Sequence, residues 1–318
     1  MNNLHIEDLS RGTFLEQEYD LAIFSCGYEE RCIDVPSLIN PEKLKCTSII
    51  HFDQHHNDPQ RKICEEFFNE KYKYAHHLSI NQTNIALLHS HVSQLVNMIQ
   101  LEKNAPLRIL IDYTSMSRAW YAALLTFFMK FYGKNIVIDL TYTNGVYHET
   151  DLNVELGDLK VIPGCEGNSL TKRNNAAIFM LGFDSYGPLR LYNLLNPNRC
   201  FGVLASPASI QKYEDTCIEK NKDFITHHLG GIENIIKLPI NSLATCYEHM
   251  SQILIPLQQE YNVSIIPFGP KPHIITSILC SLNFNNVTCM YSEYRRNRTA
   301  IVQSTGDITA SRVIFEPE

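Results

Sequence analysis

The sequence lacks the motifs that mark the commonest nucleotide-binding sites. Its 318 residues contain no Gly-x-Gly-x-x-Gly and no Gly-x-x-x-x-Gly-Lys-Ser/Thr, so ordinary dinucleotide or Walker-type binding is not predicted. Its ten cysteines form no Cys-x-x-Cys pair, and most of them stand in apolar segments. That pattern favours reduced, buried thiols over a disulfide framework.

Signals for membranes and for long nucleic acid are also missing. No apolar run approaches the roughly 20 residues that a membrane-spanning helix needs, and the N-terminus lacks the features of a signal peptide. The formal net charge is −7, which provides no global attraction to nucleic acid. We therefore expect a soluble, cytoplasmic protein with neither a membrane nor a long nucleic acid as its partner.

What the sequence does contain is an internal duplication. Ala-Ile-Phe at 22–24, followed by Gly27, returns as Ala-Ile-Phe at 177–179, followed by Gly182. A second segment starting at Ile111 returns at Ile266 with the same separation along the chain. Two diverged copies of one unit can build a joint site, so the pattern predicts an internal pseudo-dimer.

Each copy alternates buried strands with amphipathic helices, which predicts an α/β fold with two tandem Rossmann-like parallel-sheet units. The expected strands of copy one cover 20–26, 46–53, 75–80, 107–113 and 136–142. Those of copy two cover 177–181, 201–206, 235–240, 263–267 and 287–291. The expected domains are copy one at 1–150, a linker at 151–175, and copy two with a C-terminal hairpin or tail at 176–318.

In such sheets, ligands bind outside the carboxyl ends of strands one and four, where the strand order reverses. Unusual polar loops follow these strands in both copies. Hydroxyls at a helix start, with an arginine beside them, suit a phosphate, although serine and threonine are also common helix caps. The expected ligand-binding residues are Gly27, Tyr28, Thr114, Ser115, Ser117 and Arg118 in copy one, and Asp184, Tyr186, Lys271, His273, Tyr294 and Arg295 in copy two.

Carboxylates near the copy-one crevice provide an alternative chemistry. Glu29 and Asp112 could act as general acid and base, or hold Mg²⁺ beside a phosphate. Negative charge in a first helical turn is an equally ordinary explanation for Glu29. The histidines near 51–56 show no recurring ligand spacing, so no resident metal or cofactor is predicted.

The strand followed by Thr-Ser-Met-Ser-Arg at 114–118 resembles the fourth-strand motif of CARF (CRISPR-associated Rossmann fold) domains. The resemblance covers the Rossmann-like cores and two short motifs per copy. Copy one lacks the family's Gly-Gly-Thr, and Gly-Pro-Lys-Pro at 269–272 is atypical of it. The chain also resembles uncharacterised bacterial tandem Rossmann-like proteins. The CARF resemblance implies a nucleotide sensor in antiviral defence, binding a cyclic oligonucleotide between paired domains.

Three functions remain open at this stage. The first is a pseudo-dimeric sensor for a nucleotide or other phosphorylated signal, acting through a protein partner. The second is a hydrolase that cleaves a phosphodiester or N-glycosidic bond, with Glu29 and Asp112 as its catalytic residues. The third is a scaffold subunit. The sequence leaves open whether the protein is an enzyme.

Overall fold

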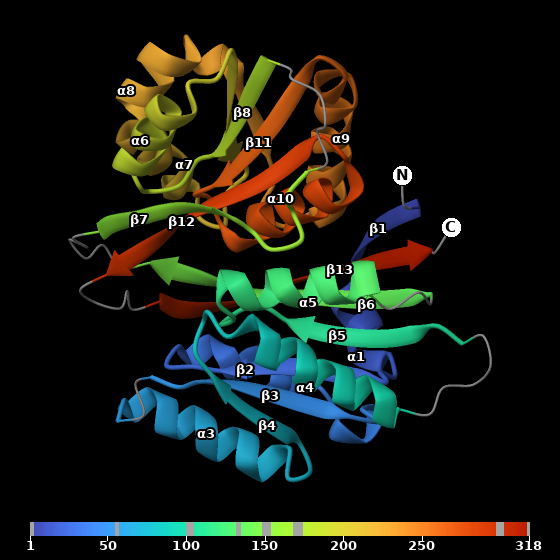
Figure 1. Cartoon of the computed structure of the whole chain (residues 1–318). Coiled ribbons are helices and arrows are strands. Elements are labelled where there is room, and N and C mark those ends of the chain that lie inside the picture. Colours follow the sequence, from blue (N-terminus) through green and yellow to red (C-terminus); the bar gives the residue numbers. More distant parts are fainter. Residues whose placement is uncertain are drawn as a thin grey trace. The chain divides into compact units, whose positions relative to one another are not determined.

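The computed structural model describes residues 3–54, 57–99, 105–131, 135–147, 154–167, 174–296 and 302–316. These residues form two compact units. The first unit comprises 3–147 together with 302–316, and the second comprises 154–296. Both are α/β, so the predicted fold of two tandem Rossmann-like units is confirmed (Figure 1).

The first unit is built on a seven-stranded sheet in the order β1-β13-β6-β5-β2-β3-β4. Its strands are β1 (Asn3–Leu9), β2 (Leu21–Cys26), β3 (Thr47–Phe52), β4 (His76–Ile80), β5 (Leu107–Asp112), β6 (Ile136–Tyr147) and β13 (Val302–Glu316). Its helices are α1 (Arg11–Glu16), α2 (Asp34–Leu38), α3 (Pro59–Lys71), α4 (Ile85–Met98) and α5 (Arg118–Phe131), with 3₁₀ turns η1 (Glu30–Ile33) and η2 (Pro41–Lys43). The strands from β6 to β4 are parallel, whereas β13 runs antiparallel to both β1 and β6.

The inner strand β2 is buried along its whole length, as a parallel strand covered on both faces should be. Side chains alternate along it, so Ala22, Phe24 and Cys26 share one face. That face packs against α3 through Cys64 and Phe68. Ser25 must then point to the opposite face of the sheet.

The second unit is built on a six-stranded sheet in the order β10-β9-β8-β11-β12-β7. Its strands are β7 (Val154–Val161), β8 (Asn174–Met180), β9 (Arg199–Ala205), β10 (Ile235–Leu238), β11 (Tyr261–Pro267) and β12 (Val287–Arg296). Its helices are α6 (Tyr186–Leu195), α7 (Gln211–Lys220), α8 (Lys222–Phe224), α9 (Leu243–Glu260) and α10 (Lys271–Asn283), with short turns η3 (Ile225–Leu229) and η4 (Ile232–Asn234). Helices α9 and α10 pack on one face of the sheet and α6, α7 and α8 on the other.

The parallel strands have the same order in both units. Along the chain, the five parallel strands of each unit are arranged three-two-one-four-five, with the first strand beside the fourth. The order therefore reverses between β2 and β5 in the first unit and between β8 and β11 in the second.

The sequence-based domain limits are wrong at two places. Val154–Val161, expected in a linker, is strand β7, which pairs with β12 in the second sheet. Val302–Glu316, expected in copy two, is strand β13 of the first sheet. Both strands cover backbone N–H and C=O groups at what would otherwise be a sheet edge. Among the described helices, none is long and apolar enough to cross a membrane.

Candidate functional site

The loops after β2 and β5 meet at the switch point of the first unit. A Cβ placed on Gly27 would lie 3.6 Å from the Phe52 ring and 3.9 Å from the Cβ of Ser115. These are ordinary contact distances, so backbone does not crowd this position. The structure thus brings together two of the residues predicted to bind a ligand, Gly27 and Ser115.

Two buried hydroxyls lie in these segments without a hydrogen-bond partner among the described residues. Ser25 is 2% exposed and its Oγ is unpaired. The Oγ of Ser115, which precedes α5, is also buried and unpaired. Leaving a buried polar group unsatisfied costs about 1–3 kcal/mol. Unpaired hydroxyls of this kind are typical of sites that accept a water molecule or a ligand.

Asp112 and Thr114 hold the loop after β5 in place. The buried Asp112 carboxylate accepts hydrogen bonds from the Thr114 backbone N–H (3.1 Å) and from its hydroxyl (2.5 Å). The same hydroxyl accepts a hydrogen bond from the N–H of Thr143 on β6 at 2.9 Å. These contacts give both side chains a role in positioning the loop.

The remaining residues of this loop begin helix α5. Ser117 accepts a hydrogen bond from the Trp120 N–H at 3.3 Å, which is the geometry of a helix cap. Arg118 is the first residue of α5 and is partly buried. Of the four residues predicted here, Thr114 and Ser117 make backbone contacts that explain their presence without a ligand.

Arg31, which the sequence reasoning did not select, is the most buried cation beside the switch point. Its side chain is 1% exposed, and its Nε donates to the Glu29 carboxylate at 2.7 Å. A terminal amino group donates to the Tyr142 hydroxyl (3.2 Å) and to the Thr143 carbonyl (3.0 Å). Tyr28 precedes this ion pair and is partly buried. The available signal for Arg31 was a single basic residue after two glutamates, close behind a mainly apolar strand.

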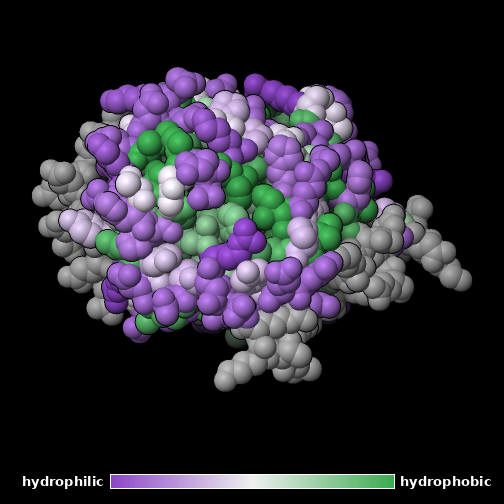
Figure 2. Space-filling model, turned by 90° about the horizontal axis from the view of Figure 1, so that it is seen from above, coloured by the Kyte–Doolittle hydropathy of each residue, from purple (hydrophilic) through white to green (hydrophobic). Residues whose placement is uncertain are grey.

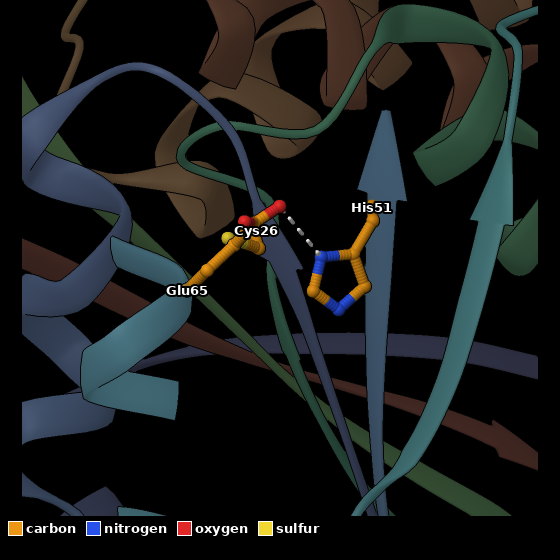
Figure 3. A group of neighbouring side chains, drawn as sticks. All are labelled: Cys26, His51 and Glu65. Atoms are coloured by element: carbon orange, nitrogen blue, oxygen red, sulfur yellow. Dashed lines mark ion pairs between the residues drawn. The ribbon is translucent and has the colours of Figure 1, made fainter. Parts of the chain in front are cut away.

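A second group of polar side chains lies on the α3 face, at the carboxyl ends of β2 and β3. Cys26 and His51 are opposite each other in the parallel register, and Glu65 reaches them from α3 (Figure 3). One ligand atom from each residue lies within 4.8 Å of the others. The Nδ1 of His51 is 3.8 Å from the Glu65 carboxylate.

Neighbouring side chains orient this Cys26–His51–Glu65 cluster. The Arg61 Nε donates to Glu65 at 2.8 Å, and Arg61 also donates to the Gln54 carbonyl. The Nε2 of His51 is 2.8 Å from the Nδ1 of His77, and the two rings are stacked.

Further thiols line the same face. The Cys32 thiol contacts those of Cys26 and Cys64, and the Cys26 contact raises the pKa of Cys32. All ten cysteines are free, and most are buried. Sequence reasoning missed the cluster because its donors come from three separate elements without a metal-binding spacing.

The corresponding loops of the second unit are packed together. A side chain on Gly182 would overlap the Phe268 carbonyl, and one on Gly187 would overlap the Phe268 ring. Asp184 accepts hydrogen bonds from the N–H groups of Tyr186 and Gly187, both at 3.0 Å, and so caps α6. The switch point between β8 and β11 is therefore more crowded than that between β2 and β5.

The other residues predicted in the second unit are dispersed. His273 is fully buried, and its Nε2 lies 3.3 Å from the Pro239 carbonyl. Tyr186 is 79% exposed, and Lys271 opens α10. Tyr294 and Arg295 belong to β12, which pairs with β7, but their side chains lie outside the described residues.

A cavity of about 300 Å³ lies elsewhere in the second unit. Its lining includes Asn175, Ala176, Asn262, Ser264 and Asn286. Several of these stand at the amino ends of β8 and β11. The cavity is therefore at the opposite edge of this sheet from the loops predicted to bind a ligand.

Comparisons with known proteins provide little context for these sites. No protein-family model matches the sequence, and no curated protein matches it. One solved structure found by similarity is the crystal structure of the cytoplasmic domain of a prokaryotic cation chloride cotransporter. That match has 9% sequence identity and a TM-score of 0.25, and it covers 86% of this chain and 95% of the other.

Proposed function

We propose that the first unit binds a nucleotide or another phosphorylated compound at the switch point between β2 and β5. The observation that carries this proposal is the pair of buried hydroxyls, Ser25 and Ser115, without partners among the described residues. Ser25 precedes Gly27 on β2, and Ser115 lies in the loop after β5, which approaches Gly27 without crowding it. The start of α5 offers backbone N–H groups, which favour an anion.

Arg118 supplies positive charge at the same helix start. A guanidinium can contact a phosphate with two parallel N–H groups, which adds geometric selectivity to the charge. The resemblance of residues 114–118 to the CARF motif supports a nucleotide as the ligand class.

We favour a sensor over a hydrolase because the two proposed catalytic carboxylates are already engaged. Glu29 is paired with Arg31, and Asp112 accepts two hydrogen bonds from Thr114. Neither arrangement points to a group that is poised to exchange a proton with a substrate.

A sensor acts on a partner, and we include a protein partner in the proposal. Figure 2 shows several hydrophobic areas near the centre of this view, separated and bordered by hydrophilic side chains. Exposed apolar surface with a polar rim is typical of protein-contact regions.

A panel of nucleotides and cyclic oligonucleotides tests the ligand class. The full chain is incubated with each compound and followed by thermal shift and by chromatography of the compound. Stabilisation without turnover supports the sensor, whereas turnover supports the hydrolase. The Arg118→Ala variant is expected to reduce the ligand-induced shift, and Arg199→Ala, in the second unit, serves as the matched control. If the ligand-induced thermal shift is undiminished in Arg118→Ala, then Arg118 does not contact the ligand.

A further inference from the structure

The Cys26–His51–Glu65 cluster brings together three donor types that bind transition metals. A thiolate, an imidazole and a carboxylate are the ligands that zinc prefers in proteins. The two strand residues are fixed opposite each other by the parallel register, and the third extends from α3. The backbone therefore sets where the donors lie.

The spacing of the donors suits one small ion. With metal–ligand bonds of about 2.0–2.3 Å, the donors of a tetrahedral site are roughly 3.3–3.8 Å apart. The His51 Nδ1 and the Glu65 oxygen are already 3.8 Å apart, and all three donors lie within 4.8 Å of one another. Side-chain movements of about 1 Å would bring all three donors within bonding distance of one ion.

A divalent cation would stabilise the deprotonated form of Cys26. This thiol is fully buried at the edge of an apolar core, where an unpaired thiolate is unfavourable. The Glu65 carboxylate is paired with the guanidinium of Arg61, which holds it in position from its other side.

The environment of His51 leaves its Nδ1 directed at the other two donors. Its Nε2 is 2.8 Å from His77, which restrains the ring and selects the nitrogen available to a metal. Figure 3 shows Cys26 and Glu65 on the Nδ1 side of the ring. A catalytic Cys-His-Glu triad needs the thiol and the carboxylate on opposite nitrogens, so this geometry fits metal coordination better than nucleophile activation.

We propose that Cys26, His51 and Glu65 form a three-ligand site for a zinc-class transition metal, with a fourth position for water or another small ligand. Three protein ligands with an open position are typical of zinc sites that do chemistry rather than only stabilise a fold. The partial exposure of His51 (13%) and Glu65 (32%) provides a route for the ion. The proposal does not depend on a phosphorylated ligand at the switch point.

The test uses the full chain, purified under reducing conditions, stripped of metal and titrated with Co²⁺ and Zn²⁺. Binding of about one equivalent is expected, with a thiolate-to-Co²⁺ charge-transfer band from Cys26. Cys26→Ser, His51→Gln and Glu65→Gln should each weaken binding at least tenfold. Cys46→Ser and His76→Gln, on or beside the same strands, are the matched controls and should bind normally.

X-ray absorption of the zinc-loaded wild-type protein supplies a result that does not depend on the variants folding. A shell with one sulfur and two or three nitrogen or oxygen atoms is expected. Two or more sulfurs would assign the metal to Cys32 or Cys64 and overturn the proposed ligand set. Absence of tight binding by the wild-type protein, or a charge-transfer band that persists in Cys26→Ser, would overturn it as well.

Discussion

The Glu30 carboxylate accepts a hydrogen bond from the backbone N–H of Ser304 at 2.9 Å, which ties the turn after β2 to the last strand of the chain. The Ser304 hydroxyl also donates to Asp34 at 2.5 Å. Ser304 pairs with Gly145 on β6, and the ladder becomes irregular between Ser304 and Ile308. Two acidic side chains after β2 thus accept hydrogen bonds from Ser304, Glu30 from its backbone N–H and Asp34 from its hydroxyl.

Replacing Glu30 with alanine should lower the free energy of unfolding by about 0.5–1 kcal/mol, because it removes the acceptor for Ser304. Chemical denaturation of the variant and the wild type measures this loss. Glu66→Ala, at an exposed position on α3, is the control and should change stability by less. Equal effects of the two substitutions would show that the Glu30 contact contributes nothing specific.

Two equivalent glycines should differ in their tolerance of alanine. Gly182→Ala is expected to destabilise the protein by about 2 kcal/mol, because the added methyl group overlaps the Phe268 carbonyl. Gly27→Ala should change stability by less than about 1 kcal/mol, because the new methyl meets only ordinary contacts. Thermal unfolding of the two variants provides the comparison, and a larger loss for Gly27→Ala would contradict the difference in crowding between the units.

Removal of the Ser115 hydroxyl should weaken ligand binding without lowering the stability of the ligand-free protein. Ser115→Ala deletes a buried group without a described partner, so the ligand-free protein should be unchanged or more stable by up to about 1 kcal/mol. The thermal shift produced by a bound phosphorylated compound should fall. A ligand-free variant that is clearly less stable than the wild type would mean that the hydroxyl is hydrogen-bonded within the protein.

Burial lowers the pKa of His273 from 6.5 to about 4. In the unfolded chain this residue therefore binds a proton at a higher pH than in the folded chain. The free energy of unfolding should therefore fall by about 3 kcal/mol between about pH 6.5 and pH 4, because the unfolded chain takes up the proton first. Above about pH 6.5 this residue causes no such loss. His273→Gln should flatten this part of the stability curve.

Urea denaturation at several pH values between 4 and 7 measures that dependence. His249→Gln, on the exposed side of α9, is the matched control and should keep the wild-type slope. The same slope in His273→Gln would show that other groups account for acid destabilisation.

Local patterns were sufficient for the parallel core of each unit. Strands such as β2 and β8 are short, buried apolar runs bounded by loops, and the helices between them carry apolar residues at helical spacing. The antiparallel strands β7 and β13 were missed, because their pairing partners are distant in the sequence and no local signal identifies them.

The two switch points also differ in how far the sequence could predict them. The approach of the Gly27 and Ser115 loops could be predicted, because the carboxyl ends of neighbouring parallel strands share one edge of a sheet. The closing of the equivalent loops around Phe268 depends on backbone contacts that residue types do not reveal.

Residue order alone accounts for the duplicated α/β architecture and for the edge at which polar loops gather, since both follow from periodicity and strand order. The Cys26–His51–Glu65 cluster required three-dimensional packing. Its donors become neighbours only through the register between β2 and β3 and through the side of α3 that faces the sheet. Such contacts depend on packing across elements, which spacing along a chain does not encode.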